Sequence, residues 1–159
     1  MRTIEHVWVF DTSFANAQNY AQDTSAELQI PITACQLLQE TVLSAEVIFT
    51  ATWSREPFLS LAMVQPGCHI TTLGPDEPGK CEVAADLIQH GLFVCDDRIF
   101  AISMSAVGGV GLNEDVIAAE LGEVITGSHP GRTTADQITI YEITIYGGVG
   151  LAFQDLIVA

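Results

Sequence analysis

Three places in the sequence combine acidic or hydroxylated side chains with a backbone that could aim them. Asp11 ends an apolar run, where its carboxylate could accept hydrogen bonds from sugar hydroxyls or cap a following helix. Residues 50–54, Thr-Ala-Thr-Trp-Ser, end a second apolar run; small side chains let a ligand approach the backbone, and they also form ordinary turns. Asp76 lies within residues 74–80, Gly-Pro-Asp-Glu-Pro-Gly-Lys, a loop rigid enough to direct a carboxylate and also typical of a turn.

The elements that would position these residues alternate along the first two thirds of the chain. Apolar stretches that predict strands cover residues 5–11, 30–35, 46–51, 67–73 and 92–95. Helical spacing is found at residues 14–28, 37–43 and 82–89. This alternation predicts an α/β fold whose mostly parallel sheet carries helices on both faces, with the strands 5–11 and 46–51 buried on both sides. Ligands of such sheets bind at the carboxyl ends of the strands, where the three candidate places lie.

A helix is expected over residues 114–125, because Asn113 can cap its start and Gly127 marks its end. Residues 108–111, Gly-Gly-Val-Gly, are interpreted as a flexible connection. No linker or low-complexity tract interrupts the sequence, which predicts a single domain over residues 1–159.

A tandem duplication stands near the end of the chain, Ile-Thr-Ile-Tyr-Glu at residues 138–142 and Ile-Thr-Ile-Tyr-Gly at 143–147. Its period-2 alternation predicts one long strand. A long flat strand at the edge of a sheet has unpaired backbone N–H and C=O groups that can pair with another strand. A final helix is expected to start near Gly150. Residues 136–159 are therefore predicted to lie in a dimer contact.

Residues 145–152 imitate the strand, glycine turn and helix of a dinucleotide-binding unit. However, Phe153 occupies the position at which that motif needs Gly or Ala. Only six residues follow Phe153, so no complete βαβ unit can follow it. The motif is therefore interpreted as a coincidence.

The spacing of the cysteines does not favour a metal site or a disulfide bond. Cys35, Cys68, Cys81 and Cys95 show no CxxC spacing and are expected to be reduced thiols. A zinc site formed by Cys68, His69 and Cys81 has unfavourable ligand spacing and is set aside. We predict no metal site.

The charge balance is strongly acidic, with 5 Lys and Arg against 20 Asp and Glu and a formal net charge of −15. Such a surface repels phosphate backbones and anionic lipids, which argues against binding to nucleic acid or membrane surfaces. It is interpreted mainly as a solvated surface, with attraction of a cationic partner as the alternative. No apolar run reaches the roughly 18 residues that span a bilayer, and the first residues lack a signal-peptide pattern, so we expect a cytoplasmic location.

Several stretches, taken in order, resemble the ornithine cyclodeaminase/mu-crystallin family. They are residues 50–57 (TATWSREP), 69–82 with its GPDEPGKCE segment, 120–127 (ELGEVITG) with 131–133 (GRT), and 149–156 (VGLAFQDL). Together they run along nearly the whole chain. The Asp76 loop and the closing segment are the most specific parts of the resemblance.

The resemblance implies a Rossmann-type NAD(P)-binding domain and a function for each candidate place. The counterpart of Asp76 lies beside the nicotinamide and acts as an acid/base group. Asp11, with Thr12 and Ser13, matches the adenosine-ribose site. The cofactor cleft would be lined by Thr50, Ala51, Thr52 and Ser54, and approached on the nicotinamide side by Val149 and Gly150.

The chain also departs from the family pattern. Members carry, before the point that matches Met1, a substrate and dimerisation domain with Arg and Lys side chains that grip the substrate. They also carry there the first Rossmann strand and its glycine-rich phosphate loop. We therefore expect an incomplete Rossmann-like fold that lacks this strand and loop, with weakened binding of NAD or NADP.

The missing strand would be central, between the strands at Val7 and Val47, and its loss would leave backbone donors and acceptors unpaired. The two strands could pair directly, or the long C-terminal strand could exchange with a second copy of the chain. The duplication favours strand exchange with a second copy, which predicts a homodimer.

Three functions follow as hypotheses. The first is a truncated cyclodeaminase-like protein without cyclodeaminase activity alone, which retains weak NAD(P) or nucleotide binding. The second is a subunit of an NAD-dependent cyclodeaminase or imine/amino-acid oxidoreductase, completed by a partner and acting on a small amino-acid-like ligand. The third is a non-catalytic dimeric interaction module.

Overall fold

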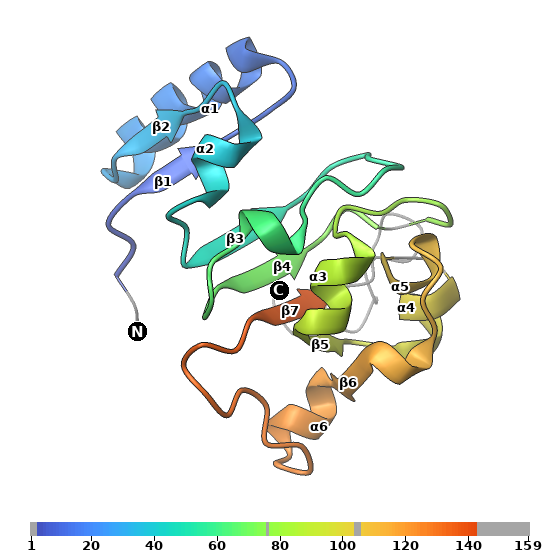
Figure 1. Cartoon of the computed structure of the whole chain (residues 1–159). Coiled ribbons are helices and arrows are strands. Elements are labelled where there is room, and N and C mark those ends of the chain that lie inside the picture. Colours follow the sequence, from blue (N-terminus) through green and yellow to red (C-terminus); the bar gives the residue numbers. More distant parts are fainter. Residues whose placement is uncertain (1–2, 76, 104–105, 143–159) are drawn as a thin grey trace, which may run out of the picture. The chain divides into compact units, whose positions relative to one another are not determined.

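The computed structural model describes residues 3–75, 77–103 and 106–142. The chain forms two compact units, Met1–Ala45 and Glu46–Ala159 (Figure 1). Each unit is an α/β arrangement with its own parallel sheet. The α/β class and the parallel strand direction predicted from the sequence are confirmed. The single domain over residues 1–159 stays a prediction.

The first unit is a small βαβ arrangement followed by a short helix. Its elements are β1 (Val7–Val9), α1 (Phe14–Leu28), β2 (Ile32–Ala34) and α2 (Leu38–Val42). The strands pair in parallel, with Val7 opposite Ile32. Helix α1 has the bounds expected from the sequence, and it buries Ala17 and Ala21, which lie one turn apart on the same face.

Strand β1 differs from its prediction as a strand buried on both sides. Its side chains alternate between half-buried and exposed, and Trp8 remains 37% exposed. Within this unit, the sheet has two strands, so there is not enough covering structure to bury both faces of β1.

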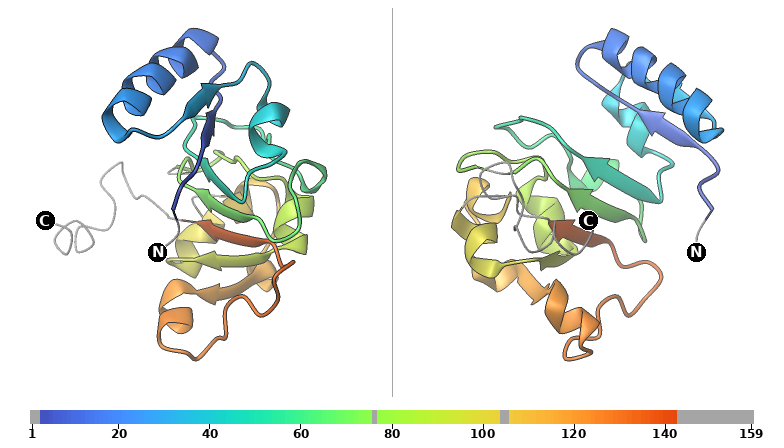
Figure 2. Two further views of the ribbon diagram at one scale, coloured as in Figure 1. Left: turned by 90° about the vertical axis from the view of Figure 1, so that its left-hand side faces the viewer. Right: turned by 180° about the vertical axis from the view of Figure 1, so that it is seen from behind.

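The second unit contains a five-stranded parallel sheet with the order β3-β4-β7-β5-β6. Figure 2 shows these strands from two further sides. Its elements are β3 (Val47–Thr50), the 3-10 helix η1 (Leu61–Met63), β4 (His69–Thr72), α3 (Ala85–His90), β5 (Leu92–Cys95), α4 (Arg98–Ser103), α5 (Ala106–Gly109), η2 (Glu114–Val116), β6 (Ile117–Glu120), α6 (Leu121–Ile125) and β7 (Thr139–Glu142). The core is formed by fully buried apolar side chains, among them Ile70, Leu87, Ile88, Phe93 and Ile140.

Strand β7 lies inside the sheet, not at its edge. Thr139 is opposite His69 of β4 on one side and opposite Leu92 of β5 on the other. The expectation of a C-terminal edge strand is therefore wrong for the described part of the tandem; residues 143–147 lie outside the described residues. The position has a physical reason, because two parallel neighbours satisfy the backbone of β7 while Ile140 is completely buried.

The helix expected over residues 114–125 is also wrong. Asn113 does act as a cap, accepting a hydrogen bond from the Asp115 N–H at 3.1 Å, but only the short helix η2 follows it. The chain then forms β6, which pairs with β5 and buries Ile117 and Ala119 on one face. Helix α6 comes after this strand, and Gly127 follows it with φ +78°. Tertiary pairing overrides the helical tendency of this Ala- and Glu-rich segment.

Two further predictions in the second unit need correction. Strand β3 is not buried on both sides: Ile48 and Thr50 are buried, while Val47 and Phe49 are exposed, so one face of the strand packs on the core and the other faces solvent. The segment 108–111, interpreted as a flexible connection, begins inside helix α5. No helix among the described residues is long and apolar enough to cross a membrane.

Candidate functional site

The candidate site is formed by two loops that leave the carboxyl ends of β3 and β4. We call residues 51–57 the first loop and residues 73–81 the second loop. Because β3 and β4 are parallel neighbours, with Thr50 opposite Thr72, both loops begin at the same edge of the sheet (Figure 1). Ligands bind at this edge in open parallel sheets.

A buried carboxylate, that of Glu82, lies where the two loops begin. Glu82 is 0% exposed, and it follows the second loop in the sequence. Its Oε2 accepts hydrogen bonds from the Thr50 hydroxyl at 2.6 Å and the Thr72 hydroxyl at 2.7 Å. These threonines are the last residues of β3 and β4, so the carboxylate joins the two strand ends.

The same carboxylate binds the backbone of both loops. Its Oε1 accepts from the Thr52 N–H at 2.5 Å, and its Oε2 accepts from the Gly74 N–H at 3.1 Å. Oε1 thus accepts from one donor and Oε2 from three, so both carboxylate oxygens act as acceptors. Burial of the charge is offset by the donors that surround it.

Direct contacts between the loops hold them side by side. The Cys81 N–H donates to the Ser54 carbonyl at 3.0 Å. Arg55 forms an ion pair with Glu77 and donates to the Pro78 carbonyl at 3.3 Å. The part of the second loop that follows position 76 is therefore attached to the first loop at several points.

A buried lysine completes this contact. Lys80 is 3% exposed, and its Nζ lies 4.1 Å from the centre of the Trp53 ring, in cation–π geometry. The same Nζ is 3.9 Å from Glu77 Oε1. Trp53 itself is 83% exposed, so its ring covers the lysine and presents its outer side to solvent.

The structure brings together one group of the residues predicted from the sequence. Thr50, Thr52 and Ser54 lie on the first loop and its base, with the exposed Ala51 between them. Ser54 donates to the Glu56 carbonyl at 2.6 Å and receives the Cys81 bond described above. Asp76, Val149 and Gly150 lie outside the described residues, although the buried Pro75 and half-buried Glu77 on either side of position 76 are placed.

Asp11, Thr12 and Ser13 belong to the first unit, where all three are exposed at the start of α1. Asp11 Oδ1 accepts from the Ser13 N–H at 2.7 Å and from the Asn16 side-chain amide at 3.4 Å. These bonds form a turn just before α1 and do not reach a backbone N–H of the helix, so the capping role of Asp11 also stays a prediction. Ser13 occupies the N-cap position but makes no side-chain capping bond. The ribose contact stays a prediction.

Cysteine and metal chemistry can be judged from the described residues. All four cysteines are free thiols and buried. Burial raises the pKa of Cys68 to about 11 and that of Cys95 to about 12, and it also raises the pKa of Cys81 beside the site. No group of three or more His, Cys, Asp and Glu side chains that could hold a metal occurs in the part of the chain that the structure describes.

Sequence reasoning gave no role to Glu82, although this residue has the most extensive polar contacts of the site. Its position between Cys81 and Val83, in a segment otherwise apolar, was the available signal, because a buried carboxylate needs several partners. Those partners come from residues 8 to 32 positions away, which a local pattern does not reveal.

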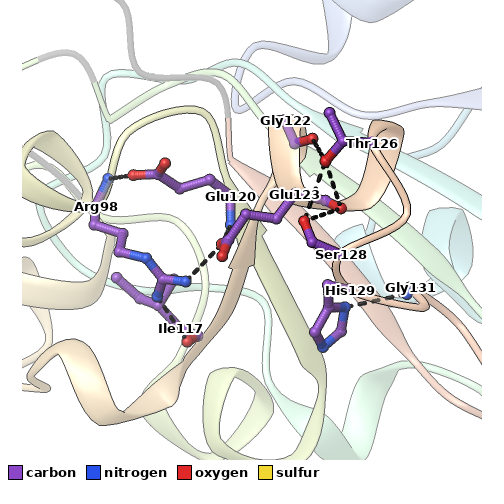
Figure 3. Close-up of polar contacts among 9 residues, drawn as sticks. All are labelled: Arg98, Ile117, Glu120, Gly122, Glu123, Thr126, Ser128, His129 and Gly131. Carbon is purple, nitrogen blue, oxygen red and sulfur yellow. Dashed lines mark hydrogen bonds and ion pairs between the residues drawn. The ribbon is translucent and has the colours of Figure 1, made fainter.

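A second polar cluster was also missed, and it has a structural role. In this Arg98 cluster, the guanidinium donates to the Ile117 carbonyl at 3.1 Å and to Glu123 Oε2 at 2.7 Å, and the Arg98 N–H donates to Glu120 Oε1 at 3.0 Å (Figure 3). The backbone N–H of Glu120 and the guanidinium of Arg98 lower the pKa of Glu123. The cluster fastens the starts of α4 and α6 to β6.

Comparison with known proteins identifies one family. The model of the ornithine cyclodeaminase/mu-crystallin family matches residues 1–159. Ketimine reductase mu-crystallin of Mus musculus is 31% identical over 157 residues, which are 99% of this chain and 46% of the mouse protein. The chain thus spans about half the length of the curated relatives it matches.

Solved structures show the same fold. An archaeal alanine dehydrogenase dimer with bound NAD superposes with a TM-score of 0.84 and 28% identity, covering 96% of this chain and 47% of that one. Thermococcus litoralis Δ1-pyrroline-2-carboxylate reductase, in complex with NADH and L-proline, gives a TM-score of 0.82 and 26% identity, covering 89% and 45%. The Rossmann-like class expected from the sequence is confirmed.

Proposed function

The chain belongs to the ornithine cyclodeaminase/mu-crystallin family, and from this premise we propose that it is a weak binder of NAD(H) or NADP(H) with no cyclodeaminase activity by itself. The family includes NAD(P)-dependent cyclodeaminases and imine reductases, and two solved relatives hold NAD or NADH. The observation that carries the proposal is the pair of loops at the carboxyl edge of β3 and β4, held together through Glu82.

The proposal assigns a part of the dinucleotide to each group of residues. The cleft is lined by Thr50, Ala51, Thr52 and Ser54, whose small side chains allow close approach to the backbone. Asp76 is the acid/base group at the nicotinamide, Asp11 with Thr12 and Ser13 contacts the adenosine ribose, and Val149 and Gly150 approach the nicotinamide side. The four free cysteines accord with a reducing, cytoplasmic location, which the proposal includes.

Binding can be measured through Trp53, which is an exposed residue of the first loop. In a Trp8→Phe variant, Trp53 is the remaining tryptophan, and its emission should be quenched by energy transfer to bound NADH. Calorimetric titration of the unmodified chain with NAD and NADP gives the affinity without a label. An absence of heat and of quenching at millimolar dinucleotide would contradict retained binding.

A second function is suggested by two solved relatives, a reductase with bound NADH and a dehydrogenase with bound NAD. Here the chain is a subunit of an NAD-dependent oxidoreductase or cyclodeaminase, and a partner supplies the glycine-rich loop and the substrate-gripping Lys and Arg. We expect NADH oxidation with a cyclic imine such as Δ1-pyrroline-2-carboxylate only when that partner is present. The test compares the chain alone with the chain co-expressed with the product of the adjoining upstream reading frame. Turnover by the chain alone would contradict this second function.

We also propose that the chain is a homodimer, as the archaeal relative is described as a dimer. The described part of β7 is already paired on both sides, so the proposed contact over residues 136–159 would use the residues of that segment that flank β7. Light scattering at micromolar concentration tests this, and a monomeric mass would contradict it. A dimer that binds neither NAD(H) nor NADP(H) would favour the remaining alternative, a non-catalytic interaction module.

A further inference from the structure

We infer that Glu82 is a positioning residue for the dinucleotide, because this one residue holds the bases of both loops that would contact it. The inference rests on the proposed function for the identity of the ligand. Its structural basis is independent of that ligand, since it consists of hydrogen bonds present in the chain itself.

The side chain of Glu82 contacts the start of each loop. The Thr52 N–H belongs to the first loop and the Gly74 N–H to the second, and they bind different oxygens of the carboxylate at 2.5 Å and 3.1 Å. A backbone N–H can only donate a hydrogen bond. Both carboxylate oxygens must therefore be acceptors for the two loops to keep these positions.

The main chain of Glu82 holds the other end of the first loop. Its carbonyl accepts from the N–H groups of Phe58 and Leu59, both at 3.0 Å. The first loop is thus attached at its beginning by the side chain and just beyond its end by the backbone of one residue. The start of the second loop is attached to the same residue, because the Gly74 N–H donates to the side chain of Glu82, eight positions later in the sequence.

The packing around the carboxylate leaves no room for it to shift toward Gly74. A Cβ atom added at Gly74 would lie 2.4 Å from the Cδ of Glu82 and 2.5 Å from the Thr52 carbonyl oxygen. Glycine therefore permits the loop backbone to approach the carboxylate closely. The geometry of one loop is transmitted to the other through a rigid contact rather than through solvent.

The decisive variant is Glu82→Gln, which keeps the size of the side chain but replaces one oxygen by an NH2 group. Whichever way the amide is turned, its NH2 faces a backbone N–H, that of Thr52 or that of Gly74. We expect amide hydrogen exchange in the affected loop to accelerate about tenfold or more relative to the amides of β5 in the same sample. We expect the dissociation constant for NADH to rise about tenfold.

The matched control is Glu123→Gln. The Glu123 carboxylate accepts hydrogen bonds from the Glu120 N–H and the Arg98 guanidinium, and it belongs to neither loop. The substitution should change neither loop exchange nor NADH affinity. Should Glu82→Gln fail to fold, Glu82→Asp retains the charge but shortens the reach to the same donors, and the same two changes are expected.

The outcomes separate the inference from the proposed function. Loop exchange equal to that of Glu123→Gln would overturn the positioning role, and so would faster exchange with an unchanged NADH dissociation constant. If the unmodified chain binds neither NADH nor NADPH, the proposed function fails. Loop exchange in Glu82→Gln then decides by itself whether Glu82 positions the two loops.

Discussion

At the scale of single residues, the site depends on a buried charge with a complete set of partners. The Glu82 carboxylate is removed from water, and each of its four donors offsets part of the cost of desolvation. Two donors are threonine hydroxyls on strand ends and two are loop amides. This division means that stability and loop position can be altered separately by substitution.

Thr72→Val should lower stability with limited effect on loop position. The hydroxyl of Thr72 is fully buried and donates to Glu82 at 2.7 Å, and valine keeps its shape without the donor. We expect the free energy of unfolding to fall by about 1–3 kcal/mol, measured by urea denaturation. Thr133→Val, at an exposed position, is the control and should change it by less than about 0.5 kcal/mol. Equal effects at the two positions would contradict the role of the Thr72 bond.

His69 should make the stability of the second unit sensitive to mild acid. Burial and then the positive charge of Arg132 lower the pKa of His69, whose ring bonds the hydroxyls of Thr139 at 2.7 Å and Thr71 at 3.2 Å. The unfolded chain therefore takes up the proton first. The contribution of His69 is present above its unfolded pKa, about 6.5, and is lost as the pH falls below that value.

Unfolding free energies between pH 5 and pH 8 measure this dependence. His69→Gln should show a shallower decline than the unmodified chain over the acidic part of that range, because glutamine does not titrate. Identical slopes would show that other groups cause the decline.

At the scale of elements, the positions of the strands determine where the loops meet. The sequence pattern predicted α1 and β5 at their observed bounds, because their apolar spacing is local. It did not predict β6 or the internal position of β7, since these depend on pairing with β5, which is distant in the sequence. Likewise, the first loop was recognised from its small residues, whereas its attachment to Glu82 required the packed sheet.

Gly74→Ala should disturb the junction between the two loops. The added Cβ would lie within 2.5 Å of both Glu82 and the Thr52 carbonyl, so the loops must separate. We expect a loss of about 1–3 kcal/mol in the free energy of unfolding and weaker NADH binding. Gly122→Ala in α6 is the matched control, because a Cβ there meets nothing within 4 Å, and it should be neutral or stabilising by up to about 1 kcal/mol. Equal thermal stability of the two variants would contradict the close approach at Gly74.

At the scale of the whole molecule, the net charge of −15 is a source of self-repulsion in the folded chain. Only 5 Lys and Arg residues are present to offset it, and several are used in specific contacts of the second unit. Added salt screens such repulsion over a length of about 10 Å at 0.1 M.

The melting temperature should therefore rise with NaCl between about 0.05 and 1 M, as measured by circular dichroism. Sorbitol at the same osmolarity is the control for effects that do not involve charge, and it should give a smaller increase. A melting temperature that falls with NaCl would indicate that favourable ion pairs, not repulsion, dominate the charge interactions.

The sequence by itself determined the α/β class, the family, and the two loops that follow β3 and β4. These features follow from local periodicity, from turn residues and from motifs formed by residues close together in the sequence. Only the tertiary structure decided that the chain forms two units, that β7 lies between β4 and β5, and that Glu82 joins the loops. Each of these depends on contacts between segments far apart in the chain, where strand pairing and the need to satisfy a buried charge outweigh local preference.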